Sequence, residues 1–535
     1  MLRAASVFGQ VFWEGGVRAL LGDDEGAARS LRAELAELGR REVIARRGAG
    51  RFAGEEEHAF RHGLVREAAY GMLTDADRAL GHRLAGAWLA QVGESDAALV
   101  ADHHERGGEP ERAVSWYRRA AEQALGGNDV VAAIARAEQA IACGAQGEER
   151  GLCRLLQAEA LLWRGESGAM EERALEAMEL LPRGGAPWCG AVAEAASAAF
   201  RLGRPERTEA LGGLLAERLD AGDAGDALLT ATSRVAFNLY LGGRGEVAGA
   251  LLERLEAAAK ARGEVAPEVR AVIVRTQARA ALNGGAPAQA VELYEASARE
   301  FERAGNLRSA CQARASAAFG RIELGAYEDA AAAFRQVMAT ADRLGLAYVS
   351  ALARNNLGNA LARLGRLDEA LAVEREAVAS LGAQGDRRLE ANSRLYLAGI
   401  LRRRGELDEA EREARRAGEL LEGHRGMRAY GLGVLASVLL AQGRGPEALA
   451  AAREAMEVVA SPDGVEEGEV QVRLTHAEAL AAAGDQEAAR AAITTAKDRL
   501  LARAEKIADA RSRQSFLGNI DENARTLALA LAWGG

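Results

Sequence analysis

Lysine is almost absent from this sequence of 535 residues, and aromatic residues are scarce. The only lysines are Lys260, Lys497 and Lys506, and none follows the glycine-rich GxxxxGK[ST] loop with which P-loop proteins hold phosphate. Aromatic residues make up 4% of the chain, whereas 49% is hydrophobic and 27% is charged. A chain of this composition is not disordered, and its alanine-rich apolar fraction favours many closely packed helices over a large sheet.

Cysteine pairs and long apolar runs are also missing. Four scattered cysteines, none in a CxxC motif, indicate neither a zinc site nor a disulfide framework. No apolar run approaches the ~18 residues that a membrane-spanning helix needs, and the N-terminus does not have the layout of a signal peptide. We therefore expect a cytoplasmic protein with reduced thiols and no membrane partner.

A basic excess is absent as well, because the net charge is −10. Binders of nucleic acid usually carry positive charge, and residues 51–75, where a recognition helix would lie, hold three arginines against five acidic residues. We expect no nucleic-acid partner, and a DNA-binding transcriptional regulator remains the weakest of the alternatives.

What the sequence does contain is a repeat of about forty residues. A glycine recurs at this spacing, usually with an alanine five residues later. The glycines are Gly165, Gly203, Gly243, Gly285, Gly325, Gly365, Gly405, Gly443 and Gly484.

Each repeat is expected to form two helices. Residues 350–364 carry an apolar stripe at helical spacing, and Gly365 then stands where a left-handed helix cap is needed. Asp368 opens the second helix, where a carboxylate suits the positive end of the dipole. Gly358 and Ala370 are small, so we expect the two helices to cross closely there.

This pattern resembles the tetratricopeptide repeat. The matching residues are Leu357, Gly358, Gly365, Leu367, Ala370 and Ala377. The resemblance implies an all-α, tetratricopeptide-like helical-hairpin solenoid, a superhelix, over residues 96–510. The period exceeds the usual ~34 residues, and a helical repeat of the HEAT type is the alternative.

The two ends of the chain do not fit the repeat. Residues 1–95 are predicted to form a small winged-helix-like domain, in which strand is confined to a β-hairpin over residues 43–60. Residues 511–535 are predicted to form a C-terminal capping helix, Arg511 to Trp533. The helices predicted in the N-terminal domain are Leu2–Leu21, Ala27–Leu38, Leu64–Leu73 and Asp77–Val92.

Catalytic motifs are missing from the sequence. It has no HRD, DFG or GxSxG motif. His58 and His62 are four residues apart, but no third metal ligand lies near them in sequence. The many carboxylates alternate with arginines on amphipathic helices, as on solvated faces. We therefore expect no enzyme, no cofactor and no metal.

Three segments resemble the bacterial STAND-type signalling ATPases that are linked to serine/threonine kinases or adenylate cyclases. They are Arg3–Gly9, Phe60–Tyr70 and Asp521–Leu527. In that family an ATPase core precedes the winged helix and a tetratricopeptide arm follows it. His62 aligns with the histidine that approaches the nucleotide, so the resemblance implies nucleotide sensing if an ATPase core is supplied. Gly63 departs from the aspartate that often follows this histidine.

The leading hypothesis is thus a non-enzymatic interaction or sensor module of a signalling regulator. Its array would bind a protein, peptide or inducer and relay that event to a linked ATPase or kinase. A free-standing tetratricopeptide adaptor or scaffold is the alternative. An in-frame P-loop in the upstream DNA would favour the regulator.

A ligand surface is predicted on the first helix of each repeat, because residues spaced i, i+4 and i+8 share one face. Arginine and asparagine on this face could hold a carboxylate or an extended backbone, so the partner is expected to be an acidic or C-terminal peptide. The unit between the two arginine-bearing ones offers Ala315, Phe319 and Glu323 instead. The predicted ligand residues are Arg275, Arg279, Asn355, Asn359, Arg363 and Arg402, with Asn283 and Arg403 beside them.

Overall fold

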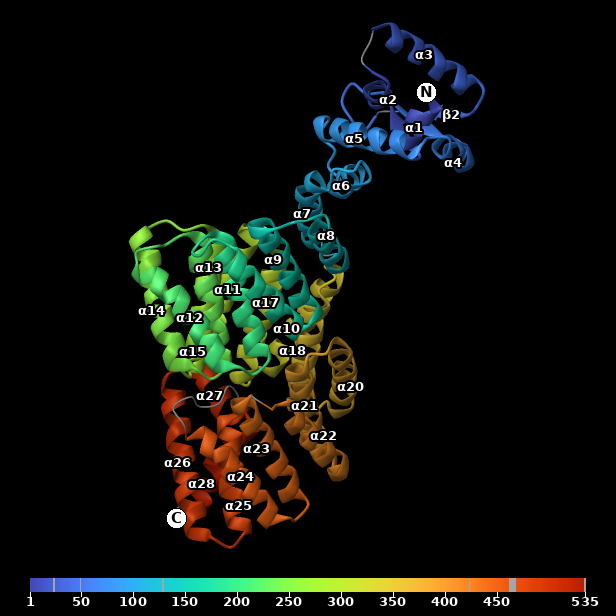
Figure 1. The fold of residues 1–535 in the computed structure, drawn as a ribbon. Coiled ribbons are helices and arrows are strands. Elements are labelled where there is room, and N and C mark those ends of the chain that lie inside the picture. The colour runs from blue at the N-terminus through green and yellow to red at the C-terminus, as the bar shows by residue number, and fades with distance from the viewer. Residues whose placement is uncertain (23–24, 49, 128, 423, 461–467, 534–535) are drawn as a thin grey trace. The chain divides into compact units, whose positions relative to one another are not determined.

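The computed structural model describes all residues except 23–24, 49, 128, 423, 461–467 and 534–535. In the described part, 28 helices and one three-stranded sheet form the regular structure (Figure 1). The fold is the predicted all-α, tetratricopeptide-like solenoid of helical hairpins. The chain divides into two compact units. The N-terminal unit is Met1–Leu161 with Glu176–Pro182, and the repeat unit is Leu162–Leu175 with Arg183–Gly535.

The N-terminal unit contains the sheet. Strand β3 (Glu57–Phe60) lies between β1 (Val11–Trp13) and β2 (Ile44–Arg46) and is antiparallel to both. The pairing of β2 with β3 confirms the hairpin predicted within residues 43–60. Strand β1 lies outside that range, so the prediction that strand is confined to the hairpin was wrong.

The predicted helix Leu2–Leu21 was also wrong, because β1 interrupts it. Helix α1 (Leu2–Val7) ends before Gly9, whose φ of +108° is a conformation that glycine adopts without strain. Phe12 and Trp13 of β1 are buried, and α2 (Glu14–Leu21) begins directly after them. The apolar run that suggested a helix instead places two aromatic side chains in the core.

The core of this unit contains a cluster of aromatic residues, which are scarce in the whole chain. The ring of Trp13 lies 4.9 Å from that of Phe52 and 5.7 Å from that of Trp88, measured between centroids. Such tilted contacts add to the area that the rings bury. The helices that surround and follow the sheet are α3 (Glu25–Arg40), α4 (Gly63–Gly71), α5 (Asp75–Gln91), α6 (Ala97–Arg106), α7 (Pro110–Gly126) and α8 (Val130–Ala142). Helices α9 (Gly147–Arg164) and α10 (Ser167–Leu180) contribute residues to both units.

The repeat unit consists of consecutive antiparallel helix pairs. Alanine lines the contacts within the pairs, as at Ala360 and Ala370, which are fully buried. The pairs are α11 (Ala186–Arg201) with α12 (Pro205–Asp220), α13 (Asp226–Leu241) with α14 (Gly245–Arg262), α15 (Pro267–Asn283) with α16 (Pro287–Arg303), α17 (Leu307–Glu323) with α18 (Tyr327–Arg343), α19 (Ala347–Arg363) with α20 (Leu367–Gln384), α21 (Arg387–Arg404) with α22 (Leu407–Leu420), α23 (Arg425–Ala441) with α24 (Gly445–Val459), and α25 (Glu469–Ala482) with α26 (Gln486–Glu505).

The recurring glycines turn the chain between the two helices of each pair. All nine glycines of the repeat, from Gly165 to Gly484, have positive φ. At Gly365 φ is +77°, and the N–H of Arg366 donates to the carbonyl of Leu361 at 3.0 Å, which satisfies one of the last carbonyls of α19. The predicted left-handed cap is confirmed.

Gly358 has a more specific reason to be small than the close helix crossing that we predicted. A Cβ at this position would collide with the side chain of Glu374. Glu374 is fully buried and faces Ser393 of α21. Burial raises the pKa of this carboxyl well above its ordinary value. The missing Cβ of Gly358 therefore makes room for a carboxyl group inside the stack.

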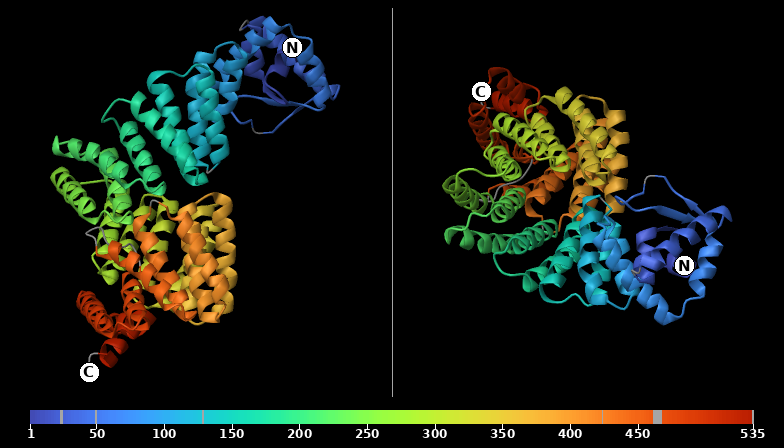
Figure 2. Two further views of the ribbon diagram at one scale, coloured as in Figure 1. Left: turned by 60° about the horizontal axis from the view of Figure 1, so that its bottom comes forward. Right: turned by 90° about the horizontal axis from the view of Figure 1, so that it is seen from above.

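The C-terminal end forms two helices, so the prediction of a single capping helix from Arg511 to Trp533 was wrong. Helix α27 (Ala510–Gly518) ends before Asn519, and α28 (Asp521–Trp533) starts two residues later. The side chain of Asn523 donates to the carbonyl of Phe516 at 2.7 Å and fixes this corner. In the right view of Figure 2, the red C-terminal helices lie beside the yellow-green hairpin of α15 and α16, where Lys506 Nζ donates to the carbonyl of Gly284 at 2.6 Å.

None of the described helices is long and apolar enough to cross a membrane.

Candidate functional site

A polar groove follows the ends of helices α15, α17 and α19 in the repeat unit. It contains two cavities of about 360 and 70 Å³ that share four lining residues, among them Glu323 and Arg503. We call it the inner groove. One side is lined by Asn283, Phe319, Glu323, Asn359 and Arg363, and the other by Glu469, Arg499, Arg503, Lys506 and Glu522.

The repeat explains why the first set of residues lies together. Asn283, Glu323 and Arg363 are the last residues of α15, α17 and α19, one repeat apart from each other. Equivalent positions of stacked repeats form a continuous row. A basic residue at the end of α19 also suits the negative end of the helix dipole. The third position of each predicted triplet therefore reaches the groove.

Arg363 is the most constrained of these residues. Its guanidinium forms an ion pair with Glu522 of α28. Burial alone lowers the pKa of Arg363, but the Glu522 carboxylate outweighs that effect and the pKa stands above its ordinary value. Burial raises the pKa of Glu522, but Arg363 outweighs it, so the pKa of this carboxyl is lowered. The pair is thus charged on both sides.

We call the cavity of about 360 Å³ the wider part of the groove and the cavity of about 70 Å³ its narrow end. The wider part carries charges of both signs. Arg503 lies 3.9 Å from the carboxylate of Glu323, and Arg499 lies 3.1 Å from that of Glu469. The side chain of Arg499 is 60% exposed. These groups offer donors and acceptors to a peptide backbone along the floor of the groove.

Four of the predicted ligand residues, Arg275, Arg279, Asn355 and Arg402, line neither cavity of the groove. Arg275 of α15 lies between Phe237 and Phe301, with its guanidinium carbon 4.9 and 5.9 Å from the ring centroids. Burial, with a smaller effect of a neighbouring arginine, lowers the pKa of Arg275 to about 10. Arg279 is 5% exposed and Asn355 is fully buried. The side chain of Asn355 has no hydrogen-bond partner among the described residues.

Arg402 and Arg403, near the end of α21, lie close to the narrow end of the groove. Arg403 forms an ion pair with Asp521 and donates to the carbonyl of Ala362 at 2.9 Å. Burial, followed by the charge of Arg403, lowers the pKa of Arg402. Its Nε is buried and makes no hydrogen bond within the part of the chain that the structure describes. Asn359 and Arg363 are thus the predicted residues that line the groove, and Arg402 lies near Arg363 without lining it.

His62 is exposed and caps the start of α4 without a side-chain hydrogen bond. His58, its neighbour in sequence, is buried in β3 and stacks on Phe12 at 5.6 Å. The two rings therefore do not share a surface. Among the described residues, no three potential metal ligands gather in one place.

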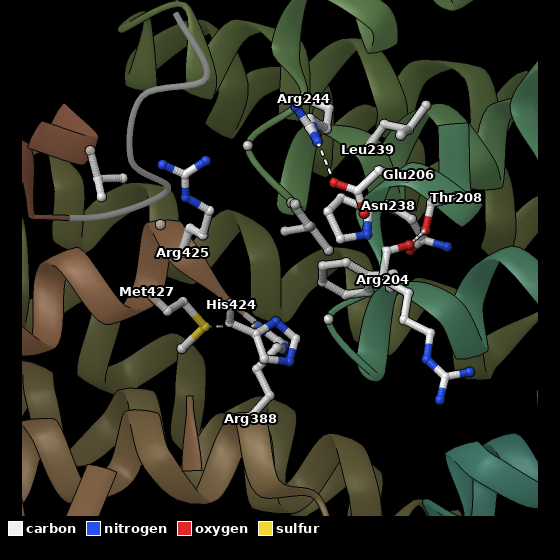
Figure 3. Close-up of a pocket in the computed structure, with 18 residues that line it drawn as sticks. Arg204, Glu206, Thr208, Asn238, Leu239, Arg244, Arg388, His424, Arg425 and Met427 are labelled. Atoms are coloured by element: carbon white, nitrogen blue, oxygen red, sulfur yellow. Dashed lines mark hydrogen bonds and ion pairs between the residues drawn. The ribbon is translucent and has the colours of Figure 1, made fainter. Parts of the chain in front are cut away.

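Sequence reasoning missed another cavity in the repeat unit, of about 90 Å³ (Figure 3). Four arginines line it, but three already have partners. Arg204 pairs with Glu171, Arg244 with Glu206 at 3.1 Å, and Arg388 stacks on Phe200. Space of this size holds a few waters or one small group. The wider cavity of the inner groove, of about 360 Å³, is larger and is therefore the better site for a peptide.

The N-terminal unit carries an apolar groove of about 980 Å³ between α1, α3 and α4. Leu64 and Met72 of α4 line it and are 78% and 69% exposed. Large apolar side chains exposed together mark a surface that can contact another protein.

No model of a known protein family matches the chain, and no curated protein matches it. Many solved structures are similar to this chain in part, and three of them follow. A STAND protein with a tetratricopeptide repeat sensor from Pyrococcus horikoshii is 12% identical, with a TM-score of 0.41 over 85% of this chain and 62% of that one. A Rap protein in complex with competence and sporulation factor is 13% identical, with a TM-score of 0.46 over 65% of this chain and 98% of that one. Yeast Tom70 is 12% identical, with a TM-score of 0.36 over 86% of this chain and 96% of that one.

The chain spans less than two thirds of the STAND protein. No function follows from similarities of this degree.

Proposed function

We propose that this chain is a non-enzymatic sensor or interaction module whose repeat array, residues 96–510, binds a protein or peptide segment in the inner groove. The observation that carries this proposal is that Asn359 and Arg363 line one end of a polar groove, with Arg402 near Arg363. Stacked repeats commonly expose their inner face to ligands. A cavity of about 360 Å³ is large enough for several side chains of an extended peptide.

The chemistry of the groove favours a ligand with carboxylate groups. Arg363 lines the narrow end, and Arg402 and Arg403 lie nearby. Arginine holds carboxylates by directed, charge-assisted hydrogen bonds. The wider end, with Arg499 and Glu469, suits a polar backbone. An acidic or C-terminal peptide segment therefore fits better than an apolar one.

We further propose that the array reports its ligand to a linked ATPase or kinase module. The winged-helix-like domain, residues 1–95, would be the connection. Leu64 and Met72 supply an exposed apolar surface on α4, and His62 stands exposed at the start of the same helix. A free-standing adaptor would use the same inner groove but would need no contact on α4.

A peptide-display selection on the immobilised chain tests the groove. Enriched peptides should contain carboxylates, and Asn359→Ala or Arg499→Ala should weaken their binding about tenfold, equal to ~1.4 kcal/mol. Arg335→Ala on α18 is the matched control, because this arginine is exposed on an outer helix and lines neither cavity of the groove. Selection of no peptide, or equal binding by all three variants, would contradict the proposal.

An ATP turnover assay tests the non-enzymatic part. The purified chain should release no phosphate above background, since its sequence has no P-loop. Turnover that follows the chain through successive columns would show that the chain is an enzyme.

A further inference from the structure

The chain's own C-terminal segment already occupies the narrow end of the inner groove. Phe516 of α27 is buried in a cluster with Leu324 and Leu500. Asn519 donates to the carbonyl of Gly325 at 3.4 Å. The corner between α27 and α28 therefore lies against the helix pair of α17 and α18, close to two hundred residues earlier in the chain.

The first turn of α28 supplies the charges that this end of the groove contacts. Asp521 pairs with Arg403, and Glu522 pairs with Arg363. Both carboxylates stand at the start of a helix, where they are also favoured by its dipole. Two consecutive carboxylates on a helix start thus meet two arginines from successive repeats.

The remaining part of α28 packs elsewhere. Leu529 is buried in a cluster with Leu474, Ala477 and Ile493 of α25 and α26. The break at Asn519 and Ile520 separates α28 from α27. The C-terminal half of α28 is therefore held by contacts that do not involve the two arginines.

Two features favour the replacement of the acidic turn by carboxylates of another molecule. The side chain of Asp521 is 62% exposed although it is paired. Beside the two pairs, Arg402 holds a buried Nε without a hydrogen-bond partner among the described residues. A donor of this kind is available to a further carboxylate.

We propose that the narrow end of the inner groove recognises a partner helix that starts with two consecutive carboxylates, and that Asp521 and Glu522 occupy it as the chain's own copy of that ligand. This inference rests on the proposed function and names its partner class. A tethered ligand competes at a high effective concentration, so the groove is closed until a partner with a better match displaces the first turn of α28.

The test uses a fluorescent synthetic peptide with the sequence of residues 518–529 and the full chain. Asp521→Asn with Glu522→Gln removes the tethered charges. This double variant should bind the peptide about tenfold more tightly than the natural chain, because more of it is in the open state. Arg402→Ala in the same background should reverse part of the gain. A peptide with the same two amide replacements is the control and should bind weakly to every variant.

Equal binding of the acidic peptide to the natural chain and the double variant would overturn the inference. If the double variant does not fold, Asp521→Asn alone replaces it, since that side chain is largely exposed. Hydrogen exchange of the natural chain gives an independent reading. Saturating peptide should raise exchange at residues 519–525, and unchanged exchange there would also overturn the inference.

The outcome can be separated from that of the proposed function. If selected library peptides bind the groove but do not compete with the 518–529 peptide, the groove binds ligands and this inference is wrong. If no library peptide binds at all, the proposed function is wrong.

Discussion

Two arginines of the predicted ligand face lie in very different surroundings. Arg275 of α15 is held between two phenylalanine rings, and burial lowers its pKa to about 10. Arg363 of α19 is held by the Glu522 carboxylate, which raises its pKa. Both were predicted to bind a ligand. Instead, Arg275 contacts two aromatic rings of the chain and Arg363 pairs with one of its carboxylates.

The difference shows how a repeat uses one residue type for two purposes. The rings around Arg275 come from α13 and α16, its near neighbours in the stack. The partner of Arg363 is 159 residues away in sequence. The first arginine fills local space, whereas the second ties two distant parts of the repeat unit together. Substitutions at the two positions should therefore have different effects.

The largest effect is expected for Arg363→Met. It leaves the Glu522 carboxylate buried without its partner, which typically costs about 3–5 kcal/mol of stability. Thermal melting should show a clear loss, and adding Glu522→Leu should recover most of it, because the unpaired charge is then removed. Arg335→Met, an exposed arginine on α18, is the control and should change little. A single variant that melts like the natural chain would contradict the role of the pair.

Gly365→Val tests whether the turn that ends α19 requires the left-handed conformation that glycine adopts. No atom lies within 4 Å of a Cβ built there, so only the positive φ opposes the substitution. The expected cost is about 1–3 kcal/mol. Gly213→Val in α12 is the matched control, since that glycine also has free space but lies within a right-handed helix. If both variants melt alike, the cap does not account for Gly365.

Two buried histidines of the N-terminal unit contact each other, and neither pairs with a carboxylate among the described residues. His82 and His103 contact each other through their Nδ1 atoms at 3.0 Å. Burial lowers the pKa of His82 to about 4 and that of His103 to about 3, with nearby positive charge adding to both shifts.

Between those values and about 6.5, the unfolded chain binds more protons than the folded chain, so stability should fall as the pH drops through this range. From pH 7 to 5 the loss should be on the order of 1–2 kcal/mol for each histidine. As the pH is lowered from 7 to 5, the melting temperature should fall less for His103→Gln than for the natural chain. Parallel curves would contradict this expectation.

The smallest effect is expected for Arg275→Met. Methionine keeps the contact with both rings and removes a charge that burial disfavours, so stability should change by less than about 1 kcal/mol in either direction. The measurement is the same melting experiment as for Arg363→Met. A loss as large as that of Arg363→Met would show that the two arginines are equivalent after all.

The repeat, its glycine turns and the hairpin within residues 43–60 could be predicted because each depends on nearby residues. The second glycine series, which includes Gly305, Gly345 and Gly385 at the ends of the outer helices, was visible in the sequence and was missed. Strand β1 was missed because the apolar run around Phe12 suits a helix as well as a buried strand.

The contents of the inner groove could not be predicted in the same way. Periodicity correctly places Asn359 and Arg363 on one face of α19, but it does not say what lies opposite. That depends on the curvature summed over many repeats, which brings Glu522 to Arg363. The burial of Arg275 likewise depends on Phe237 of an earlier repeat and Phe301 of the next helix. Such contacts depend on small differences in helix packing, and these differences cannot be predicted from the local sequence.

The contacts that close the inner groove also set an order of events in folding. A solenoid with contacts only between neighbours can grow from one end while it is being synthesised. Here Lys506 meets Gly284 across 222 residues, and Glu522 meets Arg363 across 159. These contacts can form only after α26, α27 and α28 have left the ribosome. Contacts between residues so far apart in sequence form slowly. The groove therefore becomes complete only after α27 and α28 have been synthesised, and a chain that stops before α27 would leave Arg363 and Arg403 without these carboxylate partners.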